Sequence, residues 1–192
     1  MTNNTHTRTI GDFSVINEQT IKTSCSFKFR PIDFHGKYWS RSGIVADFFA
    51  EFCIQPDKEN AESSKSSIAT NVNEMIENTA KYGDPPHHYC EVTLVLYDNY
   101  HLIIEINNDT SQENVESLLG LIDKIQANPI KTVWKELRKQ RKGKTDEEKK
   151  TTSGIGIVLA IKDYEASFDF CVDQDNHLYH IQTKLLLNLN LD

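Results

Sequence analysis

Two apolar runs near the middle of the chain restrict its fold more than any other feature. Residues 90–97 (CEVTLVLY) and 101–107 (HLIIEIN) are rich in β-branched and large apolar side chains, and only the three residues 98–100 separate them. Runs of this kind around a short polar turn are typical of a β-hairpin. We therefore expect two antiparallel strands here.

Similar patterns predict the remaining elements. Alternation at period two indicates strands, and apolar residues at spacings of three and four indicate helices. These patterns predict a strand over 24–30, helices over 38–53, 71–83 and 111–127, a helix after the glycine loop at 154–156, and a closing hairpin over 166–172 and 177–187. This order predicts an α+β fold, a two-layer sandwich whose mixed, mostly antiparallel sheet is covered on one face by helices.

The length of the chain favours one domain. At 192 residues it is long enough for a single full core, which we place over 24–192. Residues 1–23 are polar at their start and are expected to form a partly flexible lead-in, with a short strand or irregular segment over 12–21. A helical and basic insert is expected over 111–150, as a lid on the domain.

Charge and composition exclude several function classes. The formal charge of −7 argues against binding to nucleic acid or to an anionic membrane as the main activity. No apolar run is long enough to span a bilayer, and the first ten residues lack the core of a signal peptide, so we expect a cytoplasmic protein. The four cysteines (Cys25, Cys53, Cys90 and Cys171) have no metal-binding spacing and are expected to be reduced, small buried residues.

The helix expected over 71–83 carries a polar stripe beside its apolar face. Asn71, Glu74, Asn78 and Tyr82 follow one another at one-turn spacing, and Gly83 ends the helix. A carboxylate can accept a proton, and an amide oxygen one turn away can ligate a hard metal ion. The alternative is an ordinary amphipathic helix whose polar face is solvated.

Three further segments carry candidate chemistry. The strand ending at 107–110 (NNDT) concentrates short polar side chains where binding sites are often built, although Asp109, Thr110 and Ser111 are also acceptable N-caps for the next helix. Residues 130–150 hold nine Lys or Arg against four Asp or Glu, as in a solvated helix or in a lid that approaches phosphates or an acidic partner. The glycines of 151–156 (TTSGIG) suit a phosphate-binding loop before a helix. The alternative is that glycine stands at this loop-to-helix junction only because it adopts backbone conformations that other residues avoid.

Taken together, these motifs resemble the nucleotide site of the GHKL (Bergerat-fold) ATPases. The resemblance rests on Glu74-x-x-x-Asn78-x-x-x-Tyr82-Gly83, on the strand end at 107–110 and on the loop 152–157 (TSGIGI), in this order. It covers the chain from about residue 24 onward. In outline the chain is similar to the stand-alone anti-sigma-factor serine kinases, which implies the histidine-kinase-like ATPase fold.

The resemblance implies a role for each motif residue. Asn78 would ligate the magnesium ion of ATP, Glu74 would be the general base, and Lys81 and Tyr82 would lie beside the nucleotide. The residues implied to wrap the phosphates are Thr151, Thr152, Ser153, Gly154, Ile155 and Gly156. One residue among Asn107, Asn108 and Asp109 would stand where the family has the aspartate that reads adenine. The glycine that follows that aspartate in the family is absent here, so adenine selectivity is the property most affected.

Two function classes follow from the resemblance. In the first, the chain is an ATP- and Mg²⁺-dependent serine/threonine kinase that phosphorylates a small regulatory protein in a partner-switching signalling system. In the second, it is a nucleotide-gated or catalytically inactive module that regulates a partner by binding alone. A separated catalytic half of a histidine kinase is a third, weaker alternative. The resemblance is also compatible with a homodimer.

Overall fold

A single antiparallel sheet organises the protein. The computed structural model describes residues 5–30, 33, 40–54, 59–83, 89–142, 154–175 and 178–189. The sheet has six strands in the order β1-β5-β6-β4-β3-β2, and every neighbouring pair is antiparallel. The strands are β1 (His6–Ile10), β2 (Ile21–Phe29), β3 (Cys90–Tyr97), β4 (His101–Thr110), β5 (Ser167–Asp175) and β6 (Leu178–Asn188).

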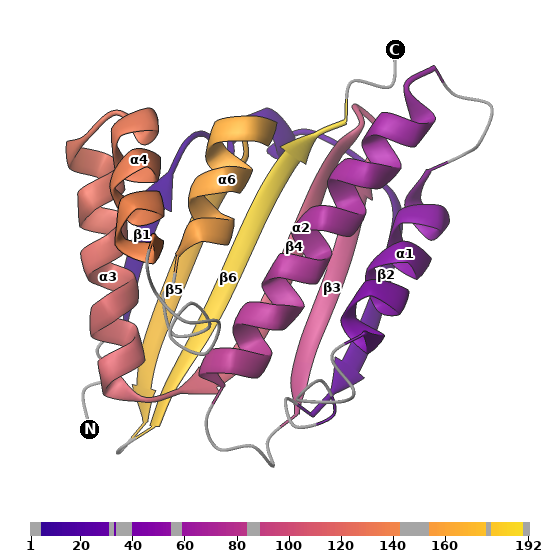
Figure 1. The fold of residues 1–192 in the computed structure, drawn as a ribbon. Coiled ribbons are helices and arrows are strands. Elements are labelled where there is room, and N and C mark those ends of the chain that lie inside the picture. The colour runs from indigo at the N-terminus through magenta and orange to yellow at the C-terminus, as the bar shows by residue number, and fades with distance from the viewer. Residues whose placement is uncertain are drawn as a thin grey trace.

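The helices lie over one face of this sheet (Figure 1). They are α1 (Arg41–Cys53), α2 (Ala61–Tyr82), α3 (Gln112–Ala127), α4 (Ile130–Arg141) and α6 (Ile155–Tyr164). The predicted α+β, two-layer architecture is therefore confirmed, with an antiparallel sheet rather than a mixed one among the described strands. No helix in the described ranges combines the length and the apolar content that a membrane span needs.

The core lies between the helices and the sheet. In β3 every second residue is buried, because successive side chains of a strand point to opposite faces. The central helix α2 buries Ile68, Val72 and Ile76 completely against this layer. The apolar face predicted for this helix is therefore confirmed. Burial of an aliphatic side chain of this size contributes about 1.5–3 kcal/mol, so this face is a major source of stability.

The central helix extends well beyond the motif segment 71–83, toward the N-terminus. It begins at Ala61, because the serine-rich segment before residue 71 continues the helix. Ser64 is buried there, and its hydroxyl donates a hydrogen bond of 2.8 Å to the backbone oxygen of Leu189. A small hydroxyl with a partner is tolerated in a core, so the polar composition of this segment does not prevent packing.

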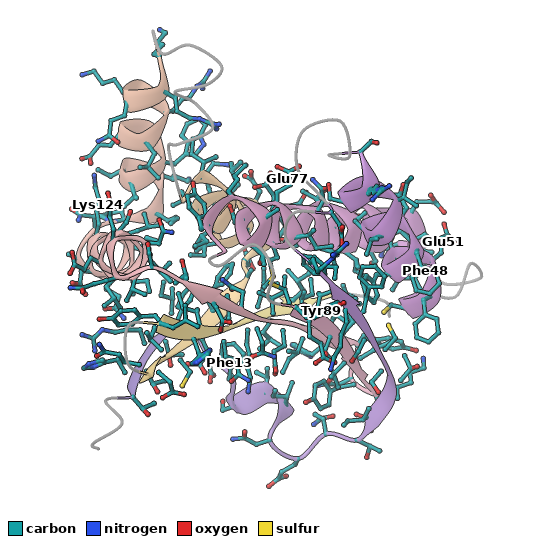
Figure 2. All side chains as sticks on the ribbon, turned by 90° about the horizontal axis from the view of Figure 1, so that it is seen from below. Phe13, Phe48, Glu51, Glu77, Tyr89 and Lys124 are labelled. Atoms are coloured by element: carbon teal, nitrogen blue, oxygen red, sulfur yellow. The ribbon has the colours of Figure 1, made fainter. Side chains whose placement is uncertain are left out.

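Helix α1 buries a different stripe from the one that its large apolar residues mark. Ala46, Phe49, Ala50 and Cys53 face the core, whereas Ile44, Phe48 and Phe52 are exposed. Figure 2 shows Phe48 at the outer surface of this helix. The inner side includes the small residues Ala46 and Ala50, and α1 packs against α2.

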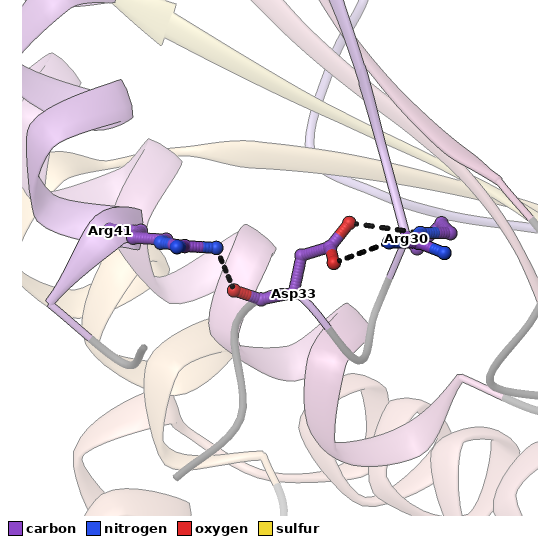
Figure 3. Close-up of polar contacts among 3 residues, drawn as sticks. All are labelled: Arg30, Asp33 and Arg41. Atoms are coloured by element: carbon purple, nitrogen blue, oxygen red, sulfur yellow. Dashed lines mark hydrogen bonds and ion pairs between the residues drawn. The ribbon is translucent and has the colours of Figure 1, made fainter. Parts of the chain in front are cut away.

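A polar cluster follows the end of β2. The Asp33 carboxylate accepts hydrogen bonds of 3.2 and 3.0 Å from the Arg30 guanidinium, and the Asp33 backbone oxygen accepts one of 3.4 Å from Arg41 (Figure 3). The hydrogen bond from Arg30 lowers the pKa of the Asp33 carboxyl below its usual value. These contacts link the end of β2 to the start of α1.

The N-terminal residues are part of the sheet, where the sequence predicted a frayed lead-in. Residues 6–10 pair with β5 as an edge strand, and the Thr9 hydroxyl donates a 2.7 Å hydrogen bond to Asp169. Strand pairing uses backbone groups, so a polar segment can form an edge strand. The chain then crosses from this edge to β2 at the opposite edge (Figure 1). Gly11, with φ +91°, makes the turn against Ser167.

Candidate functional site

A cavity of about 110 Å³ lies between the helix layer and the sheet. Its floor includes the stacked rings of Phe168 and Phe170 from β5, whose centroids are 5.6 Å apart. Polar side chains from four elements also line it: Asn78 and Tyr82 (α2), Asn108 and Thr110 (β4), Asn114 and Ser117 (α3), and Thr183 (β6). A mostly apolar cavity with a few convergent polar groups is the usual form of a small-molecule site.

The structure separates the three candidate base-reading residues at the end of β4. Asn108 lines the cavity, on the same side of the strand as the core residue Ile106. Asn107 and Asp109 point to the opposite, helix-free face of the sheet, because the side-chain period of a strand is two. There Asn107 donates to Glu105 at 3.1 Å, and Asp109 contacts His180. Only Asn108 of the three is placed to meet a group in the cavity.

A hydrogen-bond network joins the ends of α2 and β4 to the start of α3. The backbone oxygen of Tyr82 accepts bonds from the Thr110 hydroxyl at 2.5 Å and from the Asn114 side-chain amide at 3.1 Å. The same amide of Asn114 also donates to Thr110 at 3.1 Å. The Ser111 hydroxyl caps α3 by accepting from the Asn114 backbone amide, so Ser111 is the N-cap among the three candidates 109–111. This network fixes one end of the cavity.

Glu74 lies beside the N-terminus of α6. A Cβ added to Gly156 would be 2.4 Å from the Glu74 Oε2 atom, so the carboxylate occupies the space that only a glycine leaves. Gly154 begins the helix with φ +90° and lines the cavity. A Cβ there would meet the Leu121 side chain at 2.3 Å. The two glycines therefore permit close packing of α6 against α2 and α3.

The surroundings of Glu74 combine burial with mixed charge. Burial raises the pKa of the Glu74 carboxyl, and the nearby Glu77 raises it further, whereas Lys81 and Arg141 lower it. Lys81 pairs with Glu77 at 3.4 Å, and it does not line the cavity. A carboxyl whose pKa is raised toward neutrality is better matched to proton transfer at physiological pH.

The predicted phosphate loop is described only in part. Thr151, Thr152 and Ser153 lie outside the described residues. The described part is Gly154 and the first turn of α6, which includes Ile155 and Gly156. A helix N-terminus presents free backbone N–H groups and the positive end of the helix dipole, both of which favour an anion. This end of α6 faces the cavity through Gly154.

Asn114, Ser117 and Thr183 were not among the residues predicted from the sequence. Thr183 interrupts the otherwise apolar, helix-facing series Ile181, Leu185, Leu187 of β6, and this interruption is the signal that points to it. The amide of Asn114 and the two hydroxyls add donors and acceptors around the cavity. Groups of these types can form hydrogen bonds with the edge of a heterocyclic base. The Asn78 amide oxygen is a suitable ligand for a magnesium ion whose other ligands are phosphate and water oxygens.

Comparison with known proteins identifies a similar fold. No protein-family model and no curated protein matches this sequence. Among solved structures, the chain is similar to one in the crystal structure of the SiaB–SiaC complex from Pseudomonas aeruginosa. The TM-score is 0.57 and the sequence identity is 14%, over 90% of this chain and 94% of that chain. At this identity the similarity shows a shared fold over nearly the whole length of both chains.

Proposed function

We propose that this protein binds Mg-ATP in the cavity between α2, α6 and the sheet and transfers the γ-phosphate to a serine or threonine of a small regulatory protein. The observation that carries the proposal is the placement of Glu74 against Gly156, at the N-terminus of α6. This placement supports Glu74 as the general base, because a helix N-terminus is a favourable position for phosphate groups. Asn78 lies one turn further along α2 and lines the cavity, as does Gly154 at the start of α6, whereas Glu74 lies next to the lining, against Gly156.

The proposed chemistry needs only positioning, charge neutralisation and one proton transfer. Backbone N–H groups at the start of α6 would bind phosphate oxygens, and Asn78 would hold the magnesium ion that offsets their charge. Glu74 would accept the proton of the acceptor hydroxyl. The oxygen of that hydroxyl would form a bond to the γ-phosphorus while the bond between the γ-phosphorus and the ADP oxygen breaks. Its raised pKa suits this role, because a more basic carboxylate accepts a proton more readily.

The structural similarity supports a protein partner. The similar structure contains a complex of two proteins, SiaB and SiaC. A regulatory chain that acts on a small partner agrees with the partner-switching function that the resemblance to the anti-sigma-factor serine kinases implies. Phosphoryl transfer to such a partner would then decide when the two proteins associate.

One observation favours the second function class, a binding module without catalysis. The cavity lining among the described residues contains amides and hydroxyls but no carboxylate. Of Asn107, Asn108 and Asp109, the three candidates for the position of the family's aspartate, the one that lines the cavity is Asn108. Its neutral amide gives weaker hydrogen bonds than a carboxylate would. A site with an amide in place of the carboxylate is expected to bind adenine less selectively. Nucleotide binding without turnover would identify the protein as a binding module without catalysis.

Calorimetric titration of Mg-ATP tests the proposal. Wild-type protein should bind saturably, Asn78→Ala should lose the magnesium-dependent part of the affinity, and Asn107→Ala should behave as wild type, because Asn107 faces away from the cavity. GTP serves as the control for base selectivity. No heat of binding at millimolar Mg-ATP would exclude ATP as the ligand. Binding without phosphate on the serine or threonine of any purified partner would favour the second class.

A further inference from the structure

The exposed face of α4 carries a continuous stripe of positive charge. Four exposed residues of α4 fall on one side of the helix at helical pitch, and the exposed C-cap residue continues this side: Lys131, Lys135, Arg138 and Lys139, followed by Lys142. We call these five residues the α4 basic stripe. The opposite side packs Val133 and Leu137 into a small apolar cluster beside α6.

The position of α4 leaves this stripe accessible. Figure 2 shows α4 projecting from the helix layer on the side away from the sheet. The single acidic residue of the helix, Glu136, pairs with Lys124 of α3. Trp134 lies beneath two cations, Arg138 and Lys162, each 5.2 Å from its ring centroid. The ion pair of Glu136 connects α4 to α3, and the contact of Trp134 with Lys162 connects α4 to α6. Neither contact involves Lys131, Lys135 or Lys139 of the stripe.

The stripe is unusual for this chain because the rest of the molecule is acidic. Residues 130–142 hold six Lys or Arg against one Glu, a local charge of +5. The whole chain has a formal charge of −7, so the other residues together carry −12. A concentrated positive patch on an acidic protein is a directional feature, because it attracts a negative surface only in one orientation.

We propose that the α4 basic stripe is the docking surface for an acidic segment of the partner protein. A helix of this length spans about 18 Å, which suits one short acidic helix or loop. Charge complementarity identifies the occupant: five exposed cations match a segment rich in Asp and Glu. A nucleic acid or an anionic membrane presents negative charge over a much wider area, and the acidic remainder of this protein would repel it.

The stripe adjoins the candidate site. Val133 and Leu137 on the inner side of α4 pack with Val158 of α6, and the first turn of α6 lies against Glu74. The charge of Arg141, at the end of α4, also lowers the pKa of the Glu74 carboxyl. A partner protein bound to the α4 basic stripe would therefore bring a hydroxyl close to its acidic segment toward Glu74 on α2. This inference rests on the proposed function for the identity of the partner as the phosphate acceptor, whereas the docking itself requires no nucleotide.

Fluorescence anisotropy with a labelled peptide tests the docking surface. The probe is a serine between two runs of glutamate, and the same peptide with glutamine in place of glutamate is the control ligand. The test variant is Lys135→Glu/Lys139→Glu, whose two positions are exposed on α4. The matched control is Lys22→Glu/Lys28→Glu, an equal change in charge on β2 at the far edge of the sheet.

We expect the acidic peptide to bind wild type and the β2 variant similarly, and the α4 variant to bind roughly tenfold more weakly. Binding should weaken as salt rises, because exposed charges are screened. Equal binding by the α4 variant, or equal loss in both variants, would overturn the docking surface. Tighter stripe-dependent binding to phosphatidylserine vesicles or to single-stranded DNA would overturn the choice of a protein partner.

A separate measurement distinguishes this inference from the proposed function. Mg-ATP binding by calorimetry should be the same in wild type and in the α4 variant, which also shows that the variant is folded. Loss of peptide binding with retained nucleotide binding supports the docking surface. Peptide binding by a protein that never binds Mg-ATP would reject the proposed function and leave the docking surface standing.

Discussion

The Glu74 carboxylate fills the space beside Gly156 where any other residue would place its Cβ. The two residues come from different helices, α2 and α6, and no pattern within either helix links them. Their contact brings a half-buried acid to a helix N-terminus.

Substitution of Gly156 by alanine should displace the Glu74 carboxylate. The new Cβ would lie 2.4 Å from Oε2, and a flexible side-chain end can move away at small cost. We therefore expect little change in thermal stability but a fall in phosphoryl transfer or ATP hydrolysis. Gly120→Ala in α3 is the matched control, because its Cβ would meet nothing within 4 Å. Equal activity in the two variants would contradict a role for this contact.

Replacement of Glu74 by glutamine should remove turnover more than binding. The glutamine amide keeps the size of the side chain, but it cannot take the proton of the acceptor hydroxyl. The rate of phosphoryl transfer should therefore fall by about 10²–10⁴, while the Mg-ATP affinity stays within a few-fold of wild type. Single-turnover assays and calorimetry measure the two effects separately. An equal loss in both would reject the assignment of Glu74 as the general base.

Asn108 and Asn107 form a matched pair for testing the base site. They are adjacent in β4 but point to opposite faces of the sheet, and only Asn108 lines the cavity. We expect Asn108→Ala to weaken ATP binding by roughly fivefold or more, the value of a lost hydrogen bond of about 1 kcal/mol. Asn107→Ala should leave ATP binding unchanged. The reverse result would place the base on the other face of the sheet.

The buried acid should make stability depend on pH in a defined direction. Burial raises the pKa of Glu74 in the folded protein, so the ionised carboxylate destabilises the fold at neutral pH. The penalty is present above the folded-state pKa and disappears below the unfolded-state value of about 4.3. Glu74→Gln should therefore raise the melting temperature at pH 7 relative to wild type, and the difference should vanish near pH 4. A difference that grows on acidification would show the opposite shift.

Gly154 should tolerate substitution less well than Gly43. Its φ of +90° is strained for an L-residue, and a Cβ would lie 2.3 Å from the Leu121 side chain. Gly154→Ala should lower the free energy of unfolding by about 1–3 kcal/mol. Gly43→Ala, in α1 with open space around it, should be neutral or stabilising by up to about 1 kcal/mol. Denaturant titration measures both values.

The sequence pattern predicted most elements, but not every face or pairing. Hydrophobic periodicity located the strands and the buried side of α2, because burial selects apolar residues at the period of each element. It did not reveal β1, since an edge strand is held by backbone hydrogen bonds that leave no apolar pattern. It also marked the outer residues of α1, such as Phe48, as apolar without showing which side of the helix packs.

For the candidate site, the sequence alone determined which residue types stand together within one element. These are Glu74 and Asn78 at one-turn spacing, the polar end of β4, and the two glycines at the start of α6. Only the tertiary structure decided which of them meet. It directed Asn108 into the cavity and Asn107 away from it, joined Tyr82 to Thr110 and Asn114, and set Glu74 against Gly156. The physical reason is that local spacing follows from the pitch of a helix or strand, whereas contacts between elements depend on how their buried faces pack.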